Sequence, residues 1–525
     1  MKKVFLLLIA IFVMNVANAQ LTLISNPSPL DSGFMAYPII FNNNLYFQYC
    51  NSTKKFQLAK YDGITVTLIP NPSSSDLGMT GQAVLYNNNL YFSYKDSNSV
   101  NFLAKYNDTT LSLISNINTA DYGISGIPFV FNNNLYLPYK NASSKYQLAF
   151  LNGNDISLIN NLNTSDLGCA VWSPIIYNNK LFFGYQDTSL SYLASYDGVN
   201  LQIIANPDTG KWGFQNSLIV YNQALYFNYH ISTPNDYPYN GYEALAKFNG
   251  DSINLIGISD YGYFSPILYN NYLLIGDKYE GVLMGTHWTT SALSKWDSNN
   301  NGAWLEGTYD INPYDDFGYQ GCSIIYNDYM YFINNTINNA NCISKYDNIS
   351  VYCLQRPDST GSGFFDSPIV YNNKLYYCYS DMNSKYVLTK YDGTPFVKIQ
   401  NSSSSDMGVL GNLIVFNNAL YFKYLSVSNK YQLGKYIDTT STVGIINKSE
   451  TNISIYPNPT RDNLTIETNS NTNQRLEIVN LIGQTTFTTI INKKAIVNTS
   501  AFANGVYILK LLSDKETVVR KFVKE

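Results

Sequence analysis

Candidate ligand-binding residues gather around the only two histidines of the chain: His230, Asp236, Tyr237, Tyr239, Tyr242, Tyr279, His287 and Trp288. A histidine beside a carboxylate can transfer protons, and aromatic rings offer flat apolar area with a polar edge to sugars or peptides. These residues fall in two stretches that are longer than the corresponding connections elsewhere in the chain. Two interpretations stay open: a binding site, or long loops that only cover one edge of the fold.

Motifs of well-known catalytic sites are missing from the sequence. It contains no HExxH, GxSxG, P-loop or dinucleotide-binding pattern. The one combination of histidine and acid that does not repeat pairs His230 or His287 with Asp236 or Asp277. We therefore assign no catalytic residue and keep an enzyme as an alternative.

Two groups of oxygen ligands suggest a cation, with calcium as the one candidate cofactor. Asp297, Asn299 and Asn301, followed by Gly302, match the first half of a calcium loop. The twelfth position holds Thr308 where such a loop has Glu, so an enlarged polar turn is the alternative.

The second group recurs in an Asp-x-Gly pattern. A glycine precedes each of nine repeats, and seven of them carry an aspartate two residues earlier: Asp31, Asp76, Asp121, Asp166, Asp260, Asp316 and Asp406. A ring of these carboxylates could hold a cation. Alternatively, each Asp caps its own turn through backbone N–H groups. The turn explains the pattern better, because a repeated turn needs the same chemistry in every copy.

The six cysteines are too few for a dense disulfide scaffold. Cys342 and Cys353 flank Asp347-Asn348 symmetrically, and a two-residue turn there would place them directly opposite each other on neighbouring strands. They form either a disulfide or two small buried side chains. No cysteine or histidine spacing indicates zinc.

A repeat organises the elements that position these residues. The stretch Phe41 to Phe47 (FNNNLYF) returns at Tyr86, Phe131, Tyr177, Tyr221, Tyr269, Tyr326, Tyr371 and Phe416. Its Asn pair predicts a tight type I′ hairpin turn, because Asn tolerates positive φ. Asp62-Gly63 predicts a second hairpin, between a strand at 56–61 and one at 64–69.

Four short strands in each repeat of ~45 residues are typical of a propeller blade. The predicted fold class is all-β, with a nine-repeat β-propeller of four-stranded blades over residues 20–440. Leu21 to Ile24 match a fourth strand but precede the first repeat. We expect them to complete the last blade and close the ring. Eight blades plus a strand pair, or an open array, are the alternatives.

The repeat resembles the bacterial ELWxxDGT family of β-propeller-like repeats. The residues that carry the resemblance are Gln57 to Gly63, Ile69 to Ser73 and Asn89 to Phe92. Ala or Ser stands where the family has Trp, and the family's Glu is missing. The resemblance implies a secreted propeller without a defined activity.

The N-terminal residues predict export. Lys2, Lys3, the apolar run 4–13 and Ala17-Asn18-Ala19 are typical of a signal peptide over residues 1–19. That run is too short to span a membrane, and we expect no transmembrane segment in the mature chain. Charged residues make up only 13% of the chain and the net charge is -4, so no basic patch indicates nucleic-acid binding.

A polar linker at 441–452 leads to a separate domain at 453–525. Taken alone, that domain predicts a small β-sandwich, with one of its strands at 491–497. It closely resembles the type A C-terminal sorting domain of the type IX secretion system through Tyr456, Pro457, Asn458, Pro459, Gly483, Gly505, Val506 and Tyr507. The resemblance implies the type IX machinery as a partner and passage through the Gram-negative outer membrane.

The expected function is non-catalytic binding or adhesion outside the cell or on its surface, with a glycan or a surface protein as partner. One alternative is a secreted polysaccharide-acting enzyme with its site on the long loops of repeats five and six. The other is a structural surface spacer.

Overall fold

The computed structural model describes residues 20–525 except 208–212, 216, 232–241, 260–262, 284–285, 306–316, 337–339, 359–360, 394, 439–452, 469–473, 481–484 and 513–516. The signal peptide and the linker predicted above lie outside the described residues. The chain divides into two units, Met1–Thr440 and Ser441–Glu525.

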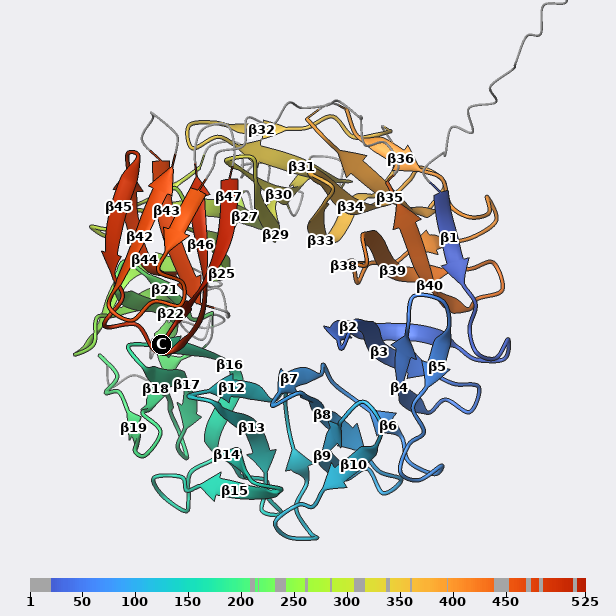
Figure 1. Ribbon diagram of the computed structural model, residues 1–525, viewed down its shortest axis with the longest axis horizontal. Coiled ribbons are helices and arrows are strands. Elements are labelled where there is room, and N and C mark those ends of the chain that lie inside the picture. The colour runs from blue at the N-terminus through green and yellow to red at the C-terminus, as the bar shows by residue number, and fades with distance from the viewer. Residues whose placement is uncertain are drawn as a thin grey trace, which may run out of the picture. The chain divides into compact units, whose positions relative to one another are not determined.

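All elements of the described residues are β-strands, and those of the first unit form successive antiparallel blades around a ring (Figure 1). The first three blades contain β2 (Gly33–Phe41), β3 (Asn44–Cys50), β4 (Phe56–Tyr61) and β5 (Val66–Leu68); β6 (Gly78–Met79), β7 (Val84–Tyr86), β8 (Asn89–Lys95), β9 (Asn101–Tyr106) and β10 (Leu111–Ile114); and β11 (Gly123–Ile124), β12 (Phe129–Phe131), β13 (Asn134–Lys140), β14 (Tyr146–Asn152) and β15 (Asp155–Ile159).

The next three blades include the two with long connections between their second and third strands. They contain β16 (Gly168–Tyr177), β17 (Lys180–Gln186), β18 (Ser191–Tyr196) and β19 (Leu201–Ile203); β20 (Gly213–Phe214), β21 (Ile219–Tyr221), β22 (Ala224–Ile231), β23 (Tyr242–Phe248) and β24 (Ile253–Ser259); and β25 (Tyr263–Tyr269), β26 (Tyr272–Leu283), β27 (Thr286–Trp296) and β28 (Gly302–Trp304).

The remaining strands of this unit complete the ring. They are β29 (Phe317–Tyr326), β30 (Tyr329–Thr336), β31 (Ala340–Tyr346) and β32 (Val351–Cys353); β33 (Gly363–Tyr371), β34 (Lys374–Ser380), β35 (Tyr386–Tyr391) and β36 (Val397–Ile399); and β37 (Gly408–Val409), β38 (Ile414–Phe416), β39 (Ala419–Leu425), β40 (Tyr431–Ile437) and the N-terminal β1 (Gln20–Ile24).

The N-terminal strand closes the ring as expected. β1 pairs antiparallel with β40, from Gln20 opposite Ile437 to Ile24 opposite Leu433. β40 also pairs with β39 on its other side, so the last blade takes its fourth strand from the start of the described chain. This pairing covers a sheet edge that would otherwise be free to pair with another chain.

The first hairpin of each blade has the predicted two-residue turn. Phe41 pairs with Asn44, and Asn42 and Asn43 have φ angles of 45° and 55°. The corresponding two residues have positive φ in every repeat. This is the backbone of a type I′ turn, which the Asn pair predicted.

The second hairpin differs from the prediction. Tyr61 pairs with Val66, so the turn has four residues rather than two. The Asp62 carboxylate Oδ1 accepts the N–H groups of Ile64 at 2.8 Å and Thr65 at 2.7 Å, which stabilises the wider turn. Ile64 belongs to this turn and is 82% exposed.

At seven of the joints between consecutive blades, a glycine approaches a neighbouring carbonyl. Gly78 forms a parallel bridge with Phe56, whose carbonyl oxygen also accepts the Asn71 side-chain N–H at 3.2 Å. A Cβ atom on Gly78 would lie 1.7 Å from that oxygen. Gly33 and Tyr431 repeat the joint between the last blade and the first. The glycine is required because the two backbones come too close for any side chain.

The hydrophobic core consists of clusters between consecutive blades. Tyr46 and Leu58 of the first blade are fully buried against Leu90 and Phe92 of the second. Phe47 and Tyr49 lie on the other face of β3 and β4 and pack against the last blade. Successive side chains on a strand therefore face opposite neighbours, as the two-residue period of a strand requires.

The second unit is a two-sheet sandwich around one apolar core. One sheet contains β41 (Ile453–Tyr456), β42 (Asn463–Thr468) and β45 (Lys494–Asn498), and the other contains β43 (Gln474–Asn480), β44 (Thr485–Ile491), β46 (Gly505–Leu512) and β47 (Thr517–Lys524). The single strand expected at 491–497 is wrong. A turn at Lys493, with φ of 63°, separates two strands that belong to different sheets.

Candidate ligand-binding site in the sixth blade

The structure describes some of the predicted ligand-binding residues in full, some by their backbone alone and some not at all. Asp236, Tyr237 and Tyr239 lie outside the described residues. For four others the structure places the backbone in strands: Tyr242 in β23, Tyr279 in β26, and His287 and Trp288 in β27. His230 is the one member of the set whose side-chain contacts are described.

The connection expected to be a long loop in the sixth repeat is a long hairpin. β26 and β27 pair continuously from Leu273 opposite Trp296 to Leu283 opposite Thr286. Val282 pairs with His287, so the predicted residues lie on the extended part of this hairpin. The additional residues of this connection therefore extend the two paired strands β26 and β27.

A cavity of about 330 Å³ lies at the base of this hairpin, where the sixth blade meets the fifth. It is lined by Gly257, Asp277, Ser294, Trp296, Gly302, Ala303 and Trp304. Gly257 belongs to β24 of the fifth blade, and the other residues belong to the sixth. Its volume is near the lower end of the range for small-molecule sites, ~300–1,000 Å³.

Hydrogen bonds hold the cavity's polar groups in place. The Trp304 indole Nε1–H donates to Asp277 Oδ2 at 3.0 Å. The Trp296 Nε1–H donates to Ser294 Oγ at 3.0 Å, and the Ser294 hydroxyl donates to the Ile275 carbonyl at 3.0 Å. Asp277 is 5% exposed, whereas Trp304 is 48% exposed, so the carboxylate lies deep and one indole lies at the surface.

Three cavity residues depart from the repeat pattern. Where the sixth repeat has Asp277, seven repeats have tyrosine: Tyr49, Tyr94, Tyr139, Tyr185, Tyr229, Tyr379 and Tyr424. Ser294 stands where the first five repeats have alanine, and its strand partner Trp304 stands where they have leucine or isoleucine. A position-by-position comparison of the repeats would therefore have revealed Ser294 and Trp304, which reasoning about loops missed.

His230 is paired with a carboxylate that the sequence analysis did not single out. It lies opposite Glu243 in the β22–β23 ladder, and its Nδ1 is 2.7 Å from Glu243 Oε1. The two side chains are 17% and 19% exposed. An imidazole oriented by a carboxylate can serve as a general base, but it equally suits a cross-strand pair within the fifth blade.

The Asp-x-Gly carboxylates are engaged by the blades themselves. Asp31 is 3% exposed and accepts the Tyr49 hydroxyl at 2.8 Å and the Ser52 N–H at 2.9 Å. Burial and the hydrogen bond to Asp31 raise the pKa of Tyr49, which keeps its hydroxyl protonated as a donor. Matching tyrosine bonds are made to Asp76, Asp121, Asp166 and Asp406, while Asp260 and Asp316 lie outside the described residues.

The half calcium loop forms a polar turn. Asp297 Oδ1 accepts the N–H groups of Asn299 at 2.8 Å and Asn301 at 2.9 Å, and Oδ2 accepts the Asn301 side-chain N–H at 2.9 Å. These hydrogen bonds lower the pKa of Asp297, with the one from the Asn301 side chain contributing most. In the described part of the chain, no three His, Cys, Asp or Glu residues are grouped so that they could hold a metal ion.

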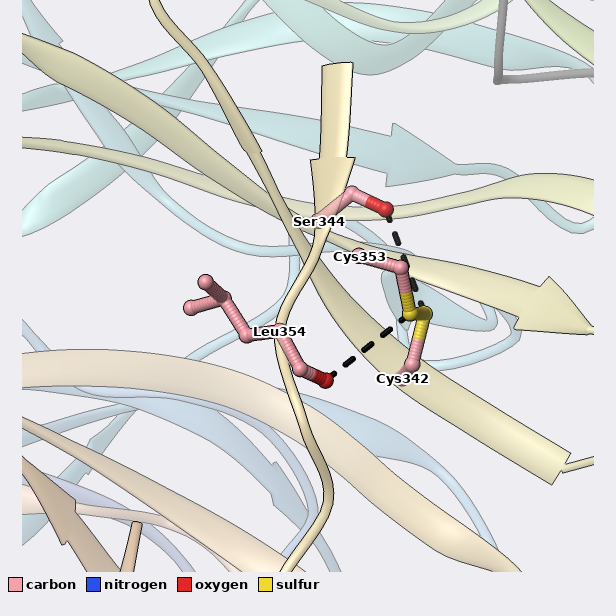
Figure 2. Close-up of a disulfide and its surroundings, with 4 residues drawn as sticks. All are labelled: Cys342, Ser344, Cys353 and Leu354. Atoms are coloured by element: carbon pink, nitrogen blue, oxygen red, sulfur yellow. Dashed lines mark hydrogen bonds between the residues drawn. A yellow bond between two sulfur atoms is a disulfide. The ribbon is translucent and has the colours of Figure 1, made fainter. Parts of the chain in front are cut away.

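Cys342 and Cys353 form a disulfide between β31 and β32 (Figure 2). Their Cα atoms are 6.4 Å apart. The predicted register is wrong, because Cys353 lies opposite Ser344 and therefore diagonal to Cys342. The turn from Asp347 to Ser350 has four residues, like the turn from Asp62 to Thr65. The two additional turn residues move the partner of Cys353 by two positions along β31, from Cys342 to Ser344.

In the C-terminal domain, the motif residues tie the first loop to the last strand. Asn458 accepts the Val523 N–H at 2.9 Å and donates to the Lys521 carbonyl at 3.3 Å. Tyr507, which follows Gly505 and Val506, stacks on Phe522 with ring centroids 5.5 Å apart. The Tyr456 hydroxyl donates to Glu467 at 2.7 Å beside Pro457 and Pro459. Gly483 lies outside the described residues.

The solved structures that match this chain include three that are 10% identical to it. A puromycin-hydrolysing peptidase of Mycobacterium tuberculosis matches with a TM-score of 0.36, over 66% of this chain and 58% of the peptidase. The β-propeller domain of the Trilobed protease from Pyrococcus furiosus matches with a TM-score of 0.33, over 70% of this chain and 97% of that domain. The structure of YCF48 bound to D1 peptide matches with a TM-score of 0.33, over 80% of this chain and 96% of the matched chain.

Among curated protein sequences, none matches the chain. The described residues contain no helix of the length and apolarity needed to cross a membrane. Residues 454–525 match the family model described as the secretion system C-terminal sorting domain. The protein is therefore secreted to the cell surface or beyond, and its C-terminal sandwich is a sorting domain of the type IX secretion system.

Proposed function

We propose that this protein is a non-catalytic binding propeller that acts outside the cell, and that its ligand enters the cavity of the sixth blade. The observation that carries the proposal is the cavity itself, which brings Asp277, Trp296 and Trp304 together from three strands. Aromatic walls with a few placed polar groups are typical of small-ligand sites. We extend the proposal to adhesion, with a surface glycan or a surface protein supplying the group that is bound.

We also propose that the repeats are of the ELWxxDGT type and that the propeller catalyses no reaction. The hairpins, the Asp-x-Gly loops and the joints between blades support an ELWxxDGT-like repeat that serves as a scaffold. Tyrosine–aspartate pairs use several of the carboxylates for folding, which supports binding rather than catalysis as the role of the ring.

Arrayed glycans and peptides test this proposal. Residues 20–525 are applied beside the Trp304→Leu variant, which restores the residue type that other repeats carry at this position. We expect binding to at least one ligand class and its loss in the variant. Equal binding by both proteins would place the site elsewhere, and absence of binding by the wild-type chain would favour the spacer.

A polysaccharide-acting enzyme is the second candidate, supported by the His230–Glu243 pair. Incubation with polysaccharides and detection of new reducing ends tests it. Activity that is lost in His230→Ala and retained in Asp197→Asn would overturn the non-catalytic proposal. Asp197 is an exposed turn residue whose position holds Asn in repeats two and five, as Asn107 and Asn249, so that control retains the turn.

A further inference from the structure

We infer that a pocket between the second and third blades binds an acidic sugar, with Lys105 as the partner of the sugar's carboxylate. This second site is separate from the sixth-blade cavity and does not rest on the function proposed for that cavity. The pocket has a volume of about 440 Å³, within the range for small-molecule sites, ~300–1,000 Å³. It is lined by residues of β9 and β10 in the second blade and by the turn between β14 and β15 in the third.

The fold directs Lys105 towards the third blade. Leu103 of β9 is fully buried in a cluster with Leu135 and Leu137 of that blade. Lys105 lies two residues further along the strand, so its side chain leaves the same face of the sheet. It is partly buried and borders the pocket. A positive charge therefore stands where the two blades diverge.

Seven repeats have a lysine at the position of Lys105, and four of these lysines bind an oxygen from the turn of the next blade. These pairs are Lys60–Asp108, Lys247–Asn300, Lys295–Asn348 and Lys390–Asp438. Lys345 and Lys435 lie over the rings of Tyr329 and Tyr421 instead. Among the described residues, the Lys105 ammonium group has neither kind of partner.

A glycine in the third blade explains why Lys105 lacks a partner. Gly153 occupies the turn position at which the second blade has Asp108, the residue that meets Lys60 at 3.0 Å. A Cβ atom on Gly153 would meet nothing within 4 Å, so the space that a carboxylate would occupy is open. A partly buried ammonium group is stabilised when an anion compensates its charge. The open space thus favours a ligand that brings a carboxylate of its own.

The other polar residues of the pocket favour a sugar over a simple anion. Five neutral polar side chains line it: Asn107, Thr110, Ser112, Ser115 and Asn154. Their amide and hydroxyl groups can donate and accept hydrogen bonds, as the hydroxyl groups of a sugar require. Asp155 also lines the pocket, but it is exposed and forms no ion pair with Lys105 in the described part of the chain. The carboxylate of the sugar therefore faces Lys105, and its hydroxyl groups face the rim.

Matched glycosides separate the charge of the ligand from its shape. The methyl glycosides of glucuronic, galacturonic and mannuronic acid are titrated by calorimetry into residues 20–525, each beside its neutral hexoside. The members of a pair differ only by a carboxylate in place of a hydroxymethyl group. We expect at least one acidic glycoside to bind at least about tenfold more tightly than its neutral partner, because only the carboxylate forms a charge-assisted bond with Lys105. Acetate, which lacks the sugar hydroxyl groups, should bind more weakly than that glycoside.

Two variants assign the effect to the pocket. Lys105→Gln removes the positive charge, whereas Gly153→Asp supplies the carboxylate that other joints contain. Asp108 has a φ of 73° and Gly153 one of 66°, so an aspartate suits this turn. Each variant should lower the affinity for the acidic glycoside by about tenfold or more and leave that for the neutral hexoside unchanged. Lys435→Gln, at the same strand position in the last blade, is the control and should change neither affinity.

The outcomes are independent of those for the sixth-blade cavity. Equal binding within all three pairs, no binding of any acidic glycoside, or acidic-glycoside binding that survives both variants would overturn the inference. Acetate that binds as tightly as the best acidic glycoside would refute a sugar site. The proposed function is tested by Trp304→Leu on the arrays, so either result can fail while the other holds.

Discussion

The Tyr379 hydroxyl donates to Asp358 Oδ1 at 2.7 Å, although Asp358 lies three residues before the position where seven other repeats carry their Asp-x-Gly aspartate. Gly361 occupies that position, and its N–H donates to the same Asp358 oxygen at 3.0 Å. The eighth blade has therefore moved the acid along the loop while keeping its bond to the strand-two tyrosine. The tyrosine–carboxylate pair, rather than the Asp-x-Gly spacing, is thus what the eighth blade shares with the first four and the last.

Removing such a carboxylate is expected to destabilise the propeller. Asp121 is 2% exposed and accepts the Tyr139 hydroxyl at 2.8 Å and the Ala142 N–H at 2.9 Å. Asp121→Ala should lower the free energy of unfolding by about 2–3 kcal/mol, because it leaves both donors buried without an acceptor. Urea denaturation measures the change. Asp155→Ala, at an exposed site in the same blade, should stay within about 0.5 kcal/mol, and an equal loss in both variants would contradict the role of the pair.

The eighth-blade pair predicts a dependence of stability on pH. Burial alone would raise the pKa of Asp358, but hydrogen bonds from Tyr379 and Lys398 outweigh it and lower that pKa below its ordinary value of 3.8. A depressed folded-state pKa gives stability that is fully present above 3.8 and is lost as pH falls through the lowered value. The difference in Tm between the wild-type chain and Asp358→Asn should thus be constant from pH 7 to about 5 and shrink below about pH 4. A difference that grows on acidification would refute this assignment.

Gly63 and Gly78 have similar φ angles but different surroundings. Substituting each of them therefore separates the cost of backbone strain from the cost of a steric clash. Gly63 and Gly78 have φ angles of 101° and 94°. A Cβ atom on Gly63 meets nothing nearer than 3.9 Å, whereas one on Gly78 lies 1.7 Å from the Phe56 carbonyl oxygen. We expect Gly63→Ala to cost about 1 kcal/mol, from strain alone, and Gly78→Ala to cost more than about 3 kcal/mol. Similar losses in chemical denaturation would show that the joint between blades relaxes easily.

The sorting domain predicts the fate of two variants in the producing cell. A chain without residues 453–525 should accumulate in the periplasm, because the signal for the outer-membrane step is gone. Asn458→Ala should lower the exported fraction, since Asn458 holds the first loop against β47 through Val523 and Lys521. Immunoblots of periplasm, cell surface and medium measure this fraction. Ile490→Ala, which changes a side chain that is 71% exposed, is the control, and wild-type export of the truncated chain would disprove the role of the domain.

Local signals predicted the fold, but not the register of the second hairpin. The Asn42-Asn43 pair specified its turn, because positive φ at both residues leaves few alternatives. At Asp62, a side-chain oxygen captures two backbone N–H groups and widens the turn, which the dipeptide Asp-Gly does not reveal. The same effect moved Cys353 from its expected place opposite Cys342 to a diagonal one.

The candidate site was only partly visible in the sequence, since its residues come from separate strands. The unusual length of repeats five and six pointed to the two blades that line the cavity. Asp277, which the sequence offered only as a possible partner of a histidine, lies within β26. Trp304 reaches Asp277 across a blade, over 27 positions of sequence, and no local pattern signals such a pair.

The pairing of β1 with β40 also determines how the ring responds to mechanical load. Gln20 lies opposite Ile437, so the start of β1 and the end of β40 lie side by side at the same end of the last blade. A force applied between these ends acts across the hydrogen bonds of the closing pair and breaks them one residue pair at a time, from Gln20 towards Ile24. A force applied along β40 with the rest of the ring held must shear its pairing with both β39 and β1. Resistance to tension therefore depends on where the protein is held, and the closing strand is the element that opens first when both ends are pulled.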